Sequence, residues 1–350
     1  PRPGPDGRRP GQARGMTPLS SDPDASGAPD CPTRPRGPRD AGLPPVFCRS
    51  EAIRAGVPVQ RLRRADVRRM APAIYQDMGR PLLDWASVGL PEPPHGMPGE
   101  VLHALLRRRS DAVLSHATAA HLHGLPTPSP AGGVVPPVDV TVPAGACRLR
   151  LPGVAARRRP LEVGDITTIR GLRVTTLERT VLDLASLPQP WAIADVIAAA
   201  DHAVHEPWSP WGRRAPATTP ERLHEALRVA GPFHGARTAR TVLARIRVGA
   251  DSARETLLRL ALEDAGLPEP ALQARPRPAE SECPEVDLYL PGPDLALQYD
   301  GRTHLTPAQQ ARDARRDAWL LARGCRTLRV NDVDHRDGYR RIIRLVGLMS

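Results

Sequence analysis

The 350-residue chain contains no lysine, so all 49 of its basic residues are arginines. It is also poor in aromatic residues, which make up 3% of the sequence. Its five cysteines form no CxxC pair, which suggests neither a zinc site nor a disulfide framework. No apolar run is long enough for a transmembrane helix, and no secretion signal is recognisable. These absences predict a cytoplasmic protein without a membrane span.

Charge is distributed unevenly along the chain, whose formal net charge is +11. Residues 46–80 contain eight arginines and three acidic residues, whereas residues 251–350 contain 15 arginines and 16 acidic residues. Because a concentrated positive segment attracts a phosphate backbone, the first segment predicts contact with nucleic acid. The second segment is nearly neutral, and its carboxylates indicate a different kind of surface.

The length suggests two or three domains, and shifts in composition indicate their boundaries. Residues 1–45 hold 12 prolines and seven glycines without apolar periodicity, which predicts a disordered segment. We expect one unit at 46–80, an α/β middle region at 100–250 with a linker at 206–220, and a third unit at 251–350. The predicted fold class is therefore α/β and multi-domain.

Residues 46–80 show the element order of a winged helix-turn-helix. The predicted elements are short helices at 50–55 and 59–65 and a hairpin at 67–75, with Ser50 as the first cap. In the second helix, Val59 and Leu62 have the spacing of buried residues. The outward-facing residues form the predicted DNA-binding set: Gln60, Arg61, Arg63 and Arg64. A small helical subdomain with solvated arginines gives the same pattern.

The middle region mixes helical and strand patterns. The predicted helices are 101–108, 111–123 and 177–187, and the predicted strands are 138–142, 165–169 and 172–174. Thr175 and Glu178 have the spacing of a capping box for the last of these helices. His116, His121 and His123 are separated by five and two residues, whereas metal-binding pairs on a helix favour a separation of four. We therefore expect these histidines to pack or to lie at the surface.

Residues 251–350 have the most regular pattern, with the predicted order α-β-β-α-β-α. The predicted helices are 253–265, 307–323 and 338–348, and the predicted strands are 285–290, 295–299 and 325–330. Ser252 and Glu255 form a capping box at the start of the first helix. Residues 291–294 (PGPD) join the first two strands as a four-residue turn.

A symmetric closure of this turn predicts a cluster of oxygen atoms on one face of the hairpin. Leu290 would then face Leu295, and Asp287 would face Gln298. Side-chain alternation places Asp300 on the face of the two polar residues. Such a ligand set suits Mg²⁺, which polarises a phosphodiester and lowers the pKa of an attacking water. The hairpin therefore predicts a metal site formed by Asp287, Gln298 and Asp300.

Several of these residues also have a plain structural explanation. Glu255 completes a helix cap as well as it supplies a ligand. Asp300 before a glycine suits a turn, and His304 suits a polar loop. Asp287 lies on a strand, where aspartate is uncommon, and this favours a functional role. The charged residues of the next helix either form ion pairs or follow a phosphate backbone: Arg312, Asp313, Arg315, Arg316 and Asp317.

These motifs resemble a domain of unknown function related to very-short-patch-repair (Vsr) endonucleases. The resemblance covers about residues 252–345 and rests on 286–288 (VDL), 297–304 (LQYDGRTH) and the Arg-Asp pairs of the following helix. It implies the restriction-endonuclease-like fold of the PD-(D/E)XK superfamily and Mg²⁺-dependent DNA cleavage or nicking. The implied catalytic residues are Glu255, Asp287, Gln298, Asp300 and His304.

Two positions depart from that pattern. Gln298 stands where the family usually has glutamate, and an amide supplies no charge, so Mg²⁺ affinity should be lower. The chain has no lysine, and Asp300 occupies the position of the superfamily's catalytic lysine. The repair endonucleases use histidine instead, which makes His304 the candidate for that role.

The front half resembles AbiEi-type abortive-infection antitoxins. Residues 45–47, 55–57 and 74–75 resemble their N-terminal winged helix, and residues 115–120, 124–126 and 174–180 resemble the region that follows it. This resemblance implies a DNA-binding regulator that has a cognate toxin as its partner.

Two hypotheses of different classes follow. The main one is a protein that binds double-stranded DNA and carries a Vsr-like, Mg²⁺-dependent endonuclease domain, acting in defence or repair. The alternative is a non-catalytic, antitoxin-type transcriptional regulator whose nuclease-like domain is a binding platform. Gln298 favours the alternative, whereas Asp287, Asp300 and His304 favour the enzyme. A neighbouring gene for a nucleotidyltransferase-like toxin would support the alternative.

Overall fold

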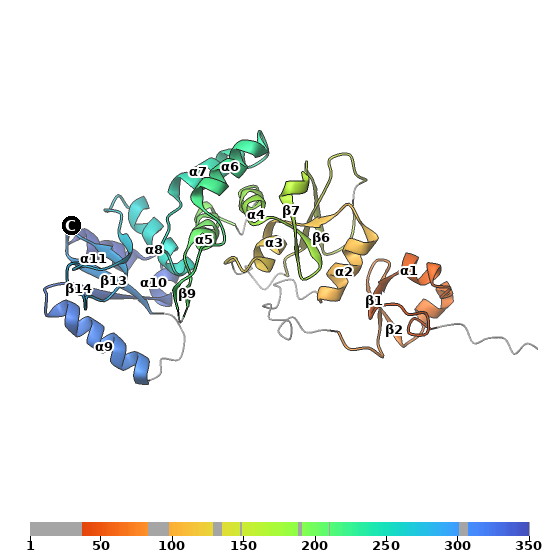
Figure 1. The fold of residues 1–350 in the computed structure, drawn as a ribbon, viewed down its shortest axis with the longest axis horizontal. Coiled ribbons are helices and arrows are strands. Elements are labelled where there is room, and N and C mark those ends of the chain that lie inside the picture. Colours follow the sequence, from red (N-terminus) through yellow and green to blue (C-terminus); the bar gives the residue numbers. More distant parts are fainter. Residues whose placement is uncertain are drawn as a thin grey trace, which may run out of the picture.

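The computed structural model describes residues 37–82, 98–128, 135–147, 149–187, 191–209, 211–300 and 307–349. The molecule is elongated, and its structural units follow one another in chain order (Figure 1). Helices and strands alternate within these units. The predicted α/β class is therefore confirmed at the level of a mixed, multi-sheet protein. Within these described segments, no helix has the length and apolarity needed to cross a membrane.

The N-terminal unit is a three-stranded antiparallel sheet in the order β1-β3-β2. Its elements are β1 (Val46–Cys48), α1 (Arg49–Arg54), a 3-10 helix (Val59–Arg63), β2 (Val67–Ala71) and β3 (Ile74–Asp77). The N-cap of α1 is Cys48 and not Ser50, because Glu51 accepts the Cys48 N–H at 2.6 Å. The expected second helix is one short 3-10 segment, in which Leu62 is buried and Val59 is only half-buried.

Part of the segment that composition predicts to be disordered packs against this unit. Leu43 is buried in an apolar cluster with Phe47 and Leu62. The Arg80 guanidinium donates to the Leu43 carbonyl at 2.6 Å. Order thus extends through residues 37–45, whereas residues 1–36 lie outside the described residues.

The middle region contains a five-stranded mixed sheet in the order β6-β5-β4-β8-β7. Its elements are α2 (Gly99–Arg108), β4 (Val113–Leu114), α3 (His116–Leu122), β5 (Val138–Val142), β6 (Val154–Arg158), a 3-10 helix (Val163–Asp165), β7 (Ile166–Ile169), β8 (Leu172–Thr175) and α4 (Leu177–Leu184). The helix expected at 111–123 is therefore interrupted by β4. Thr176, and not Thr175, caps α4 by accepting the Arg179 N–H.

Helix α2 connects the N-terminal sheet to the middle sheet. Its buried leucines share one apolar core with Val46 and Ile74 of the first sheet and with Val140 of the second. Arg107 reaches back to pair with Glu51 at 2.7 Å. The two units are thus packed directly against each other.

A helical layer follows and covers α4. It consists of α5 (Ile193–Val204), a short hairpin of β9 (Trp208–Ser209) and β10 (Gly212–Arg213), α6 (Pro220–Ala230) and α7 (Ala236–Arg245). Apolar residues of these helices form a second core with Val181 and Leu184. The hairpin lies in the segment predicted to be a linker at 206–220.

The C-terminal unit is a four-stranded sheet in the order β11-β12-β13-β14, antiparallel except for the parallel pair β13–β14. Its elements are α8 (Ala253–Asp264), β11 (Ala271–Ala274), β12 (Val286–Leu290), β13 (Leu295–Asp300), α9 (Pro307–Leu321), β14 (Arg326–Asn331), α10 (Asp332–Arg336) and α11 (Arg340–Gly347). The predicted α-β-β-α-β-α elements are present, and β11 and α10 are additional. The expected pairing of Leu290 with Leu295 is confirmed.

Helix α8 packs on two sides. Leu258 and Leu262 contribute to the core of the C-terminal sheet, whereas Leu260 lies in the core of the preceding helical layer. On that second side the fully buried Arg259 pairs with the fully buried Asp201 of α5 at 2.9 Å. This helix therefore joins the C-terminal unit to α5.

Candidate functional site

The 3-10 helix of the N-terminal unit presents part of the predicted DNA-binding set. Gln60, Arg63 and Arg64 are exposed. Arg61 is not free as expected, because its guanidinium forms two hydrogen bonds with the Asp66 carboxylate, at 2.6 and 2.5 Å. This contact raises the pKa of Arg61 and lowers the pKa of Asp66. Arg61 thus stabilises the turn that leads into β2.

Two further arginines extend this surface onto the sheet. Arg68 and Arg69 on β2 are exposed, and β2 packs beside the 3-10 helix. We call Arg63, Arg64, Arg68 and Arg69 the basic edge. The hairpin was predicted without these two arginines as site residues; strand alternation, which puts Arg68 on the face opposite the apolar Val67, was the available signal for Arg68.

The second predicted site begins at the N-terminus of α8. Glu255 is 5% exposed and accepts hydrogen bonds from the Ser252 hydroxyl at 2.7 Å, the Asp251 N–H at 3.0 Å and the Gln273 amide at 3.0 Å. Burial, and after it the charge of Asp287, raises the pKa of Glu255 to about 7. Ser252 is thus the N-cap of α8, since its hydroxyl accepts the Glu255 N–H, and Glu255 supports this turn and takes up a proton near neutral pH.

Asp287 and Gln298 lie directly opposite each other, as the hairpin register implies. In the amide orientation that pairs donors with acceptors, Gln298 donates to Asp287 Oδ1 and accepts the Asp287 N–H, both at 3.2 Å. The Tyr299 N–H donates to Asp287 Oδ2 at 2.8 Å. Both carboxylate oxygens thus have protein partners, and neither partner is a cation. Burial raises the pKa of Asp287, which Arg316 of α9 partly opposes.

Asp300, the third residue of the predicted metal site, is held by a different neighbour. It is 38% exposed and pairs with Arg329 of β14 at 2.6 Å. The same guanidinium pairs with Asp317 of α9 at 2.6 Å. Asp300 therefore has its own cation within the protein, unlike Asp287.

The magnesium site remains a prediction. In the parts of the chain that the structure describes, no three histidine, cysteine, aspartate or glutamate side chains are grouped to hold a metal ion. The structure brings Glu255, Asp287 and Gln298 together but ties Asp300 to Arg329. His304 lies outside the described residues.

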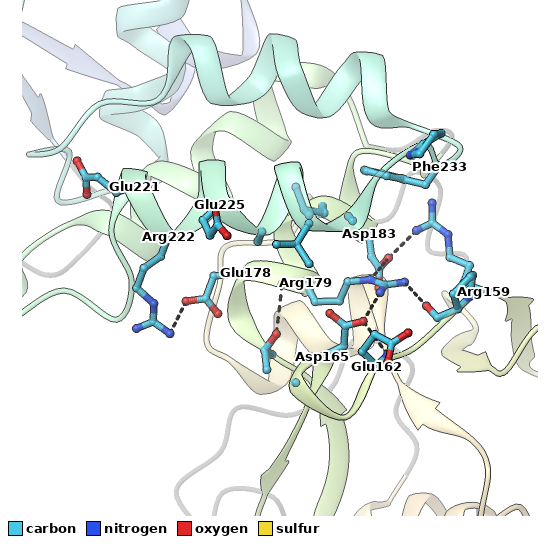
Figure 2. A pocket seen from close by; sticks show the side chains of 18 residues that line it. Arg159, Glu162, Asp165, Glu178, Arg179, Asp183, Glu221, Arg222, Glu225 and Phe233 are labelled. Carbon is cyan, nitrogen blue, oxygen red and sulfur yellow. Dashed lines mark hydrogen bonds and ion pairs between the residues drawn. The ribbon is translucent and has the colours of Figure 1, made fainter.

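A separate cavity of about 710 Å³ lies in the middle region, between α4, α6 and the loop before β7. Figure 2 shows charged side chains from these elements around it, with Phe233 at one end. Its apolar wall comes from α6 and includes Ala226, Val229 and Ala230. This cavity was not predicted, because its lining comes from segments far apart in the sequence.

Ion pairs organise the charged side of this cavity. Asp183 is fully buried and accepts from Arg159 at 2.5 Å and from Arg179 at 3.1 Å. Arg179 also pairs with Asp165 at 2.7 Å (Figure 2). Burial raises the pKa of Asp183, and the two guanidinium groups oppose that rise. Glu178, expected in a capping box, instead pairs with Arg222 of α6 at 2.8 Å.

The buried side of this ion-pair cluster meets a polar core. His116 Nδ1 lies 2.9 Å from the Ser115 hydroxyl and 4.0 Å from Asp183 Oδ2. Its backbone has a φ of 50°, which is strained for a residue other than glycine. Burial lowers the pKa of His116 well below its usual range, so the ring is neutral. His116 is completely buried, as the packing prediction requires.

Comparison with known families identifies the middle region. Residues 111–243 match the family model of the AbiEi antitoxin C-terminal domain. This match includes the cavity, its ion pairs and the polar core around His116. The predicted AbiEi resemblance is therefore confirmed for the middle region. No curated protein and no solved structure matches the chain.

Proposed function

We propose that this protein is a DNA-binding regulator of the antitoxin type. The match of residues 111–243 to the AbiEi antitoxin C-terminal domain is the observation that carries this proposal. In it, the N-terminal unit is a winged helix that binds duplex DNA, the middle region neutralises a cognate toxin, and the C-terminal unit is a nuclease-like binding platform. The alternative drawn from the sequence is thus preferred over the enzyme.

Two features of the N-terminal unit support DNA binding. The sheet order β1-β3-β2, with helical elements between β1 and β2, is the strand order expected for a winged helix. The basic edge places four exposed arginines on the 3-10 helix and β2. Arginine side chains that contact phosphates supply most of the salt-dependent affinity for DNA.

The contacts of Asp287 support the binding-platform role of the C-terminal unit. Each Asp287 oxygen already accepts one hydrogen bond, Oδ1 from the Gln298 amide and Oδ2 from the Tyr299 N–H, so less of its acceptor capacity is left for a metal. The buried carboxylates of Glu255 and Asp287 favour the second candidate, a metal-dependent nuclease, because their repulsion would be relieved by a cation. The binding platform and the metal-dependent nuclease are distinguished by whether the protein nicks plasmid DNA.

DNA binding is tested with the double variant Arg63→Ala/Arg64→Ala. It should weaken binding to duplex DNA from the gene's own promoter region and reduce the salt slope by about one unit for each lost phosphate contact. Arg340→Ala/Arg344→Ala, on the exposed side of α11, is the matched control and should leave the slope unchanged. Equal slopes for both variants would contradict the winged-helix assignment.

The platform and the nuclease are separated by plasmid nicking. The full chain and Asp287→Asn are incubated with supercoiled DNA and Mg²⁺. For a platform, neither protein nicks the plasmid. Nicking by the parent that Asp287→Asn abolishes would replace the platform by the nuclease.

The antitoxin role is tested by looking for a neighbouring gene for a nucleotidyltransferase-like toxin and co-producing that toxin with the full chain. The full chain should relieve growth arrest by that toxin, and Arg63→Ala/Arg64→Ala should relieve it equally, because neutralisation is assigned to the middle region. Arrest that persists with correctly folded protein would refute the proposal.

A further inference from the structure

The hairpin of β9 and β10 exposes two large aromatic side chains. Trp208 is 61% exposed and Trp211 is 94% exposed. The chain has only five tryptophans, and aromatic residues make up 3% of it. Because moving an indole out of water lowers the free energy, two exposed indoles on one short hairpin indicate a binding surface.

The hairpin is fixed to the C-terminal unit by one arginine. The Arg213 guanidinium donates to Asp251 at 2.9 Å, to Glu285 at 2.7 Å and to the Glu206 carbonyl at 2.9 Å. It also lies 5.3 Å from the centre of the Trp208 ring. Two-residue strands are too short to persist alone, so these contacts hold the hairpin and the Trp208 ring in place.

Both anchors of Arg213 adjoin the carboxylate cluster. Asp251 donates its N–H to Glu255, and Glu285 precedes Asp287 by two residues. Figure 1 shows β9 beside the C-terminal unit, below α5. The indoles are thus at the edge of the C-terminal unit and belong to a surface distinct from the basic edge.

We propose that Trp208 and Trp211 form a stacking surface for unpaired nucleobases, so that this part of the chain binds single-stranded nucleic acid. Indole faces stack on any base. The Arg213 guanidinium, whose charge Asp251 and Glu285 balance, packs on the Trp208 ring, and the exposed Arg214 next to it supplies a phosphate contact. Paired bases in duplex DNA do not offer their faces, which separates this surface from the duplex-binding role of the N-terminal unit.

The surroundings of the hairpin favour nucleic acid over an apolar partner. A protein or lipid docking surface needs a contiguous apolar patch. Here charged residues flank the indoles: Glu206 precedes them, and Arg213 and Arg214 follow them. Exposed aromatic faces with the exposed Arg214 beside them combine the stacking and phosphate contacts that single-strand binding proteins use.

The test uses the full chain and a fluorescently labelled oligothymidylate, with binding followed by anisotropy. Trp208→Ala/Trp211→Ala should lower the affinity, by roughly 5- to 150-fold for each stacked base. Trp208→Phe/Trp211→Phe should restore most of the loss, because phenyl rings also stack. Trp319→Phe, a partly buried tryptophan on α9, is the matched control and should bind like the parent.

A second substrate separates this proposal from the function proposed above. Arg63→Ala/Arg64→Ala should weaken duplex binding and leave oligothymidylate binding unchanged. Oligothymidylate binding that is absent, or that survives the double tryptophan-to-alanine change, would overturn the proposal. Tryptophan-dependent binding to phosphatidylglycerol vesicles, without binding to the oligonucleotide, would overturn it in favour of a lipid surface.

Discussion

Two aspartates, one fully buried and one partly buried, show how differently the same side chain is used in two regions of this molecule. Asp183 in the middle region is fully buried and accepts from two guanidinium groups. Asp287 in the C-terminal unit is largely buried and accepts only from an amide and a backbone N–H, while Glu255 adds a second carboxyl nearby. Burial raises the pKa of both aspartates, but only Asp183 has its counter-charge in direct contact.

This difference separates a carboxylate that stabilises the fold from a carboxylate that could bind a proton or a cation. A buried ion pair with both partners present has its charge compensated within the protein, and removing one partner leaves the other uncompensated. A buried carboxyl without a contacting cation is stabilised by a proton or by an external cation. The middle-region cluster is therefore expected to maintain the fold, whereas the C-terminal cluster is expected to respond to pH and to ions.

The largest effect is expected when Asp183 is neutralised. Asp183→Asn should lower the free energy of unfolding by about 3–5 kcal/mol, because Arg159 and Arg179 lose their shared buried partner. The matched change Asp287→Asn should stay within about 1 kcal/mol, since asparagine keeps an acceptor for the Tyr299 N–H. Urea denaturation at pH 7 measures both, and equal losses would abolish the distinction.

The next effect is a pH dependence of stability that arises at Glu255. Its folded-state pKa of about 7 exceeds its ordinary value of 4.5, so the native state binds the proton more tightly. This stabilisation is fully present below about pH 4.5 and is lost as the pH rises through 7, a fall of about 3 kcal/mol. Glu255→Gln should flatten the curve of unfolding free energy over this range. A variant curve as steep as that of the parent would assign the dependence to another group.

A smaller effect is expected from Gln298→Glu. The new carboxylate would face Asp287 and replace a hydrogen bond by repulsion, so the metal-free protein should lose about 2 kcal/mol. Added Mg²⁺ should raise the melting temperature of the variant more than that of the parent. Identical Mg²⁺ responses would show that this cluster does not bind the ion even when its charge is restored.

The smallest effect is expected at Asp300. Its ion pair with Arg329 is about one third exposed, and Arg329 keeps Asp317 as a partner. Asp300→Asn should therefore change the free energy of unfolding by at most about 1 kcal/mol in urea denaturation. A larger loss would place Asp300 with Asp183 as a structural charge.

Local patterns were sufficient for much of the C-terminal unit. The turn at 291–294 sets the register of the hairpin, so the opposition of Asp287 and Gln298 followed from counting residues. The approach of Gln273 to Glu255 could not be predicted, because β11 (ALQA) lacks the alternation that marks a strand. The pairing of Asp300 with Arg329 was also not predicted, since it depends on the parallel alignment of β13 with β14.

The structures of the N-terminal and middle regions were harder to predict from the sequence, because they also depend on contacts that local patterns do not show. Composition predicted disorder before Val46, yet Leu43 gains a buried position that only the folded neighbour provides. Val113 and Leu114 form a strand because the adjacent β5 and β8 offer hydrogen bonds, although the local sequence pattern predicts a helix. The Arg61 contact with Asp66 depended on a turn geometry that spacing alone does not define.

The buried pair of Arg259 with Asp201 bears on how the protein could be divided. A shortened chain that ended before α8 would keep Asp201 but lose the guanidinium that neutralises it, together with the Thr256 hydroxyl that donates to it at 3.0 Å. The complementary fragment would begin with a helix that exposes an arginine and Leu260 to water. Each fragment would carry a defect that the other repairs, so the two regions are expected to unfold together as one cooperative unit.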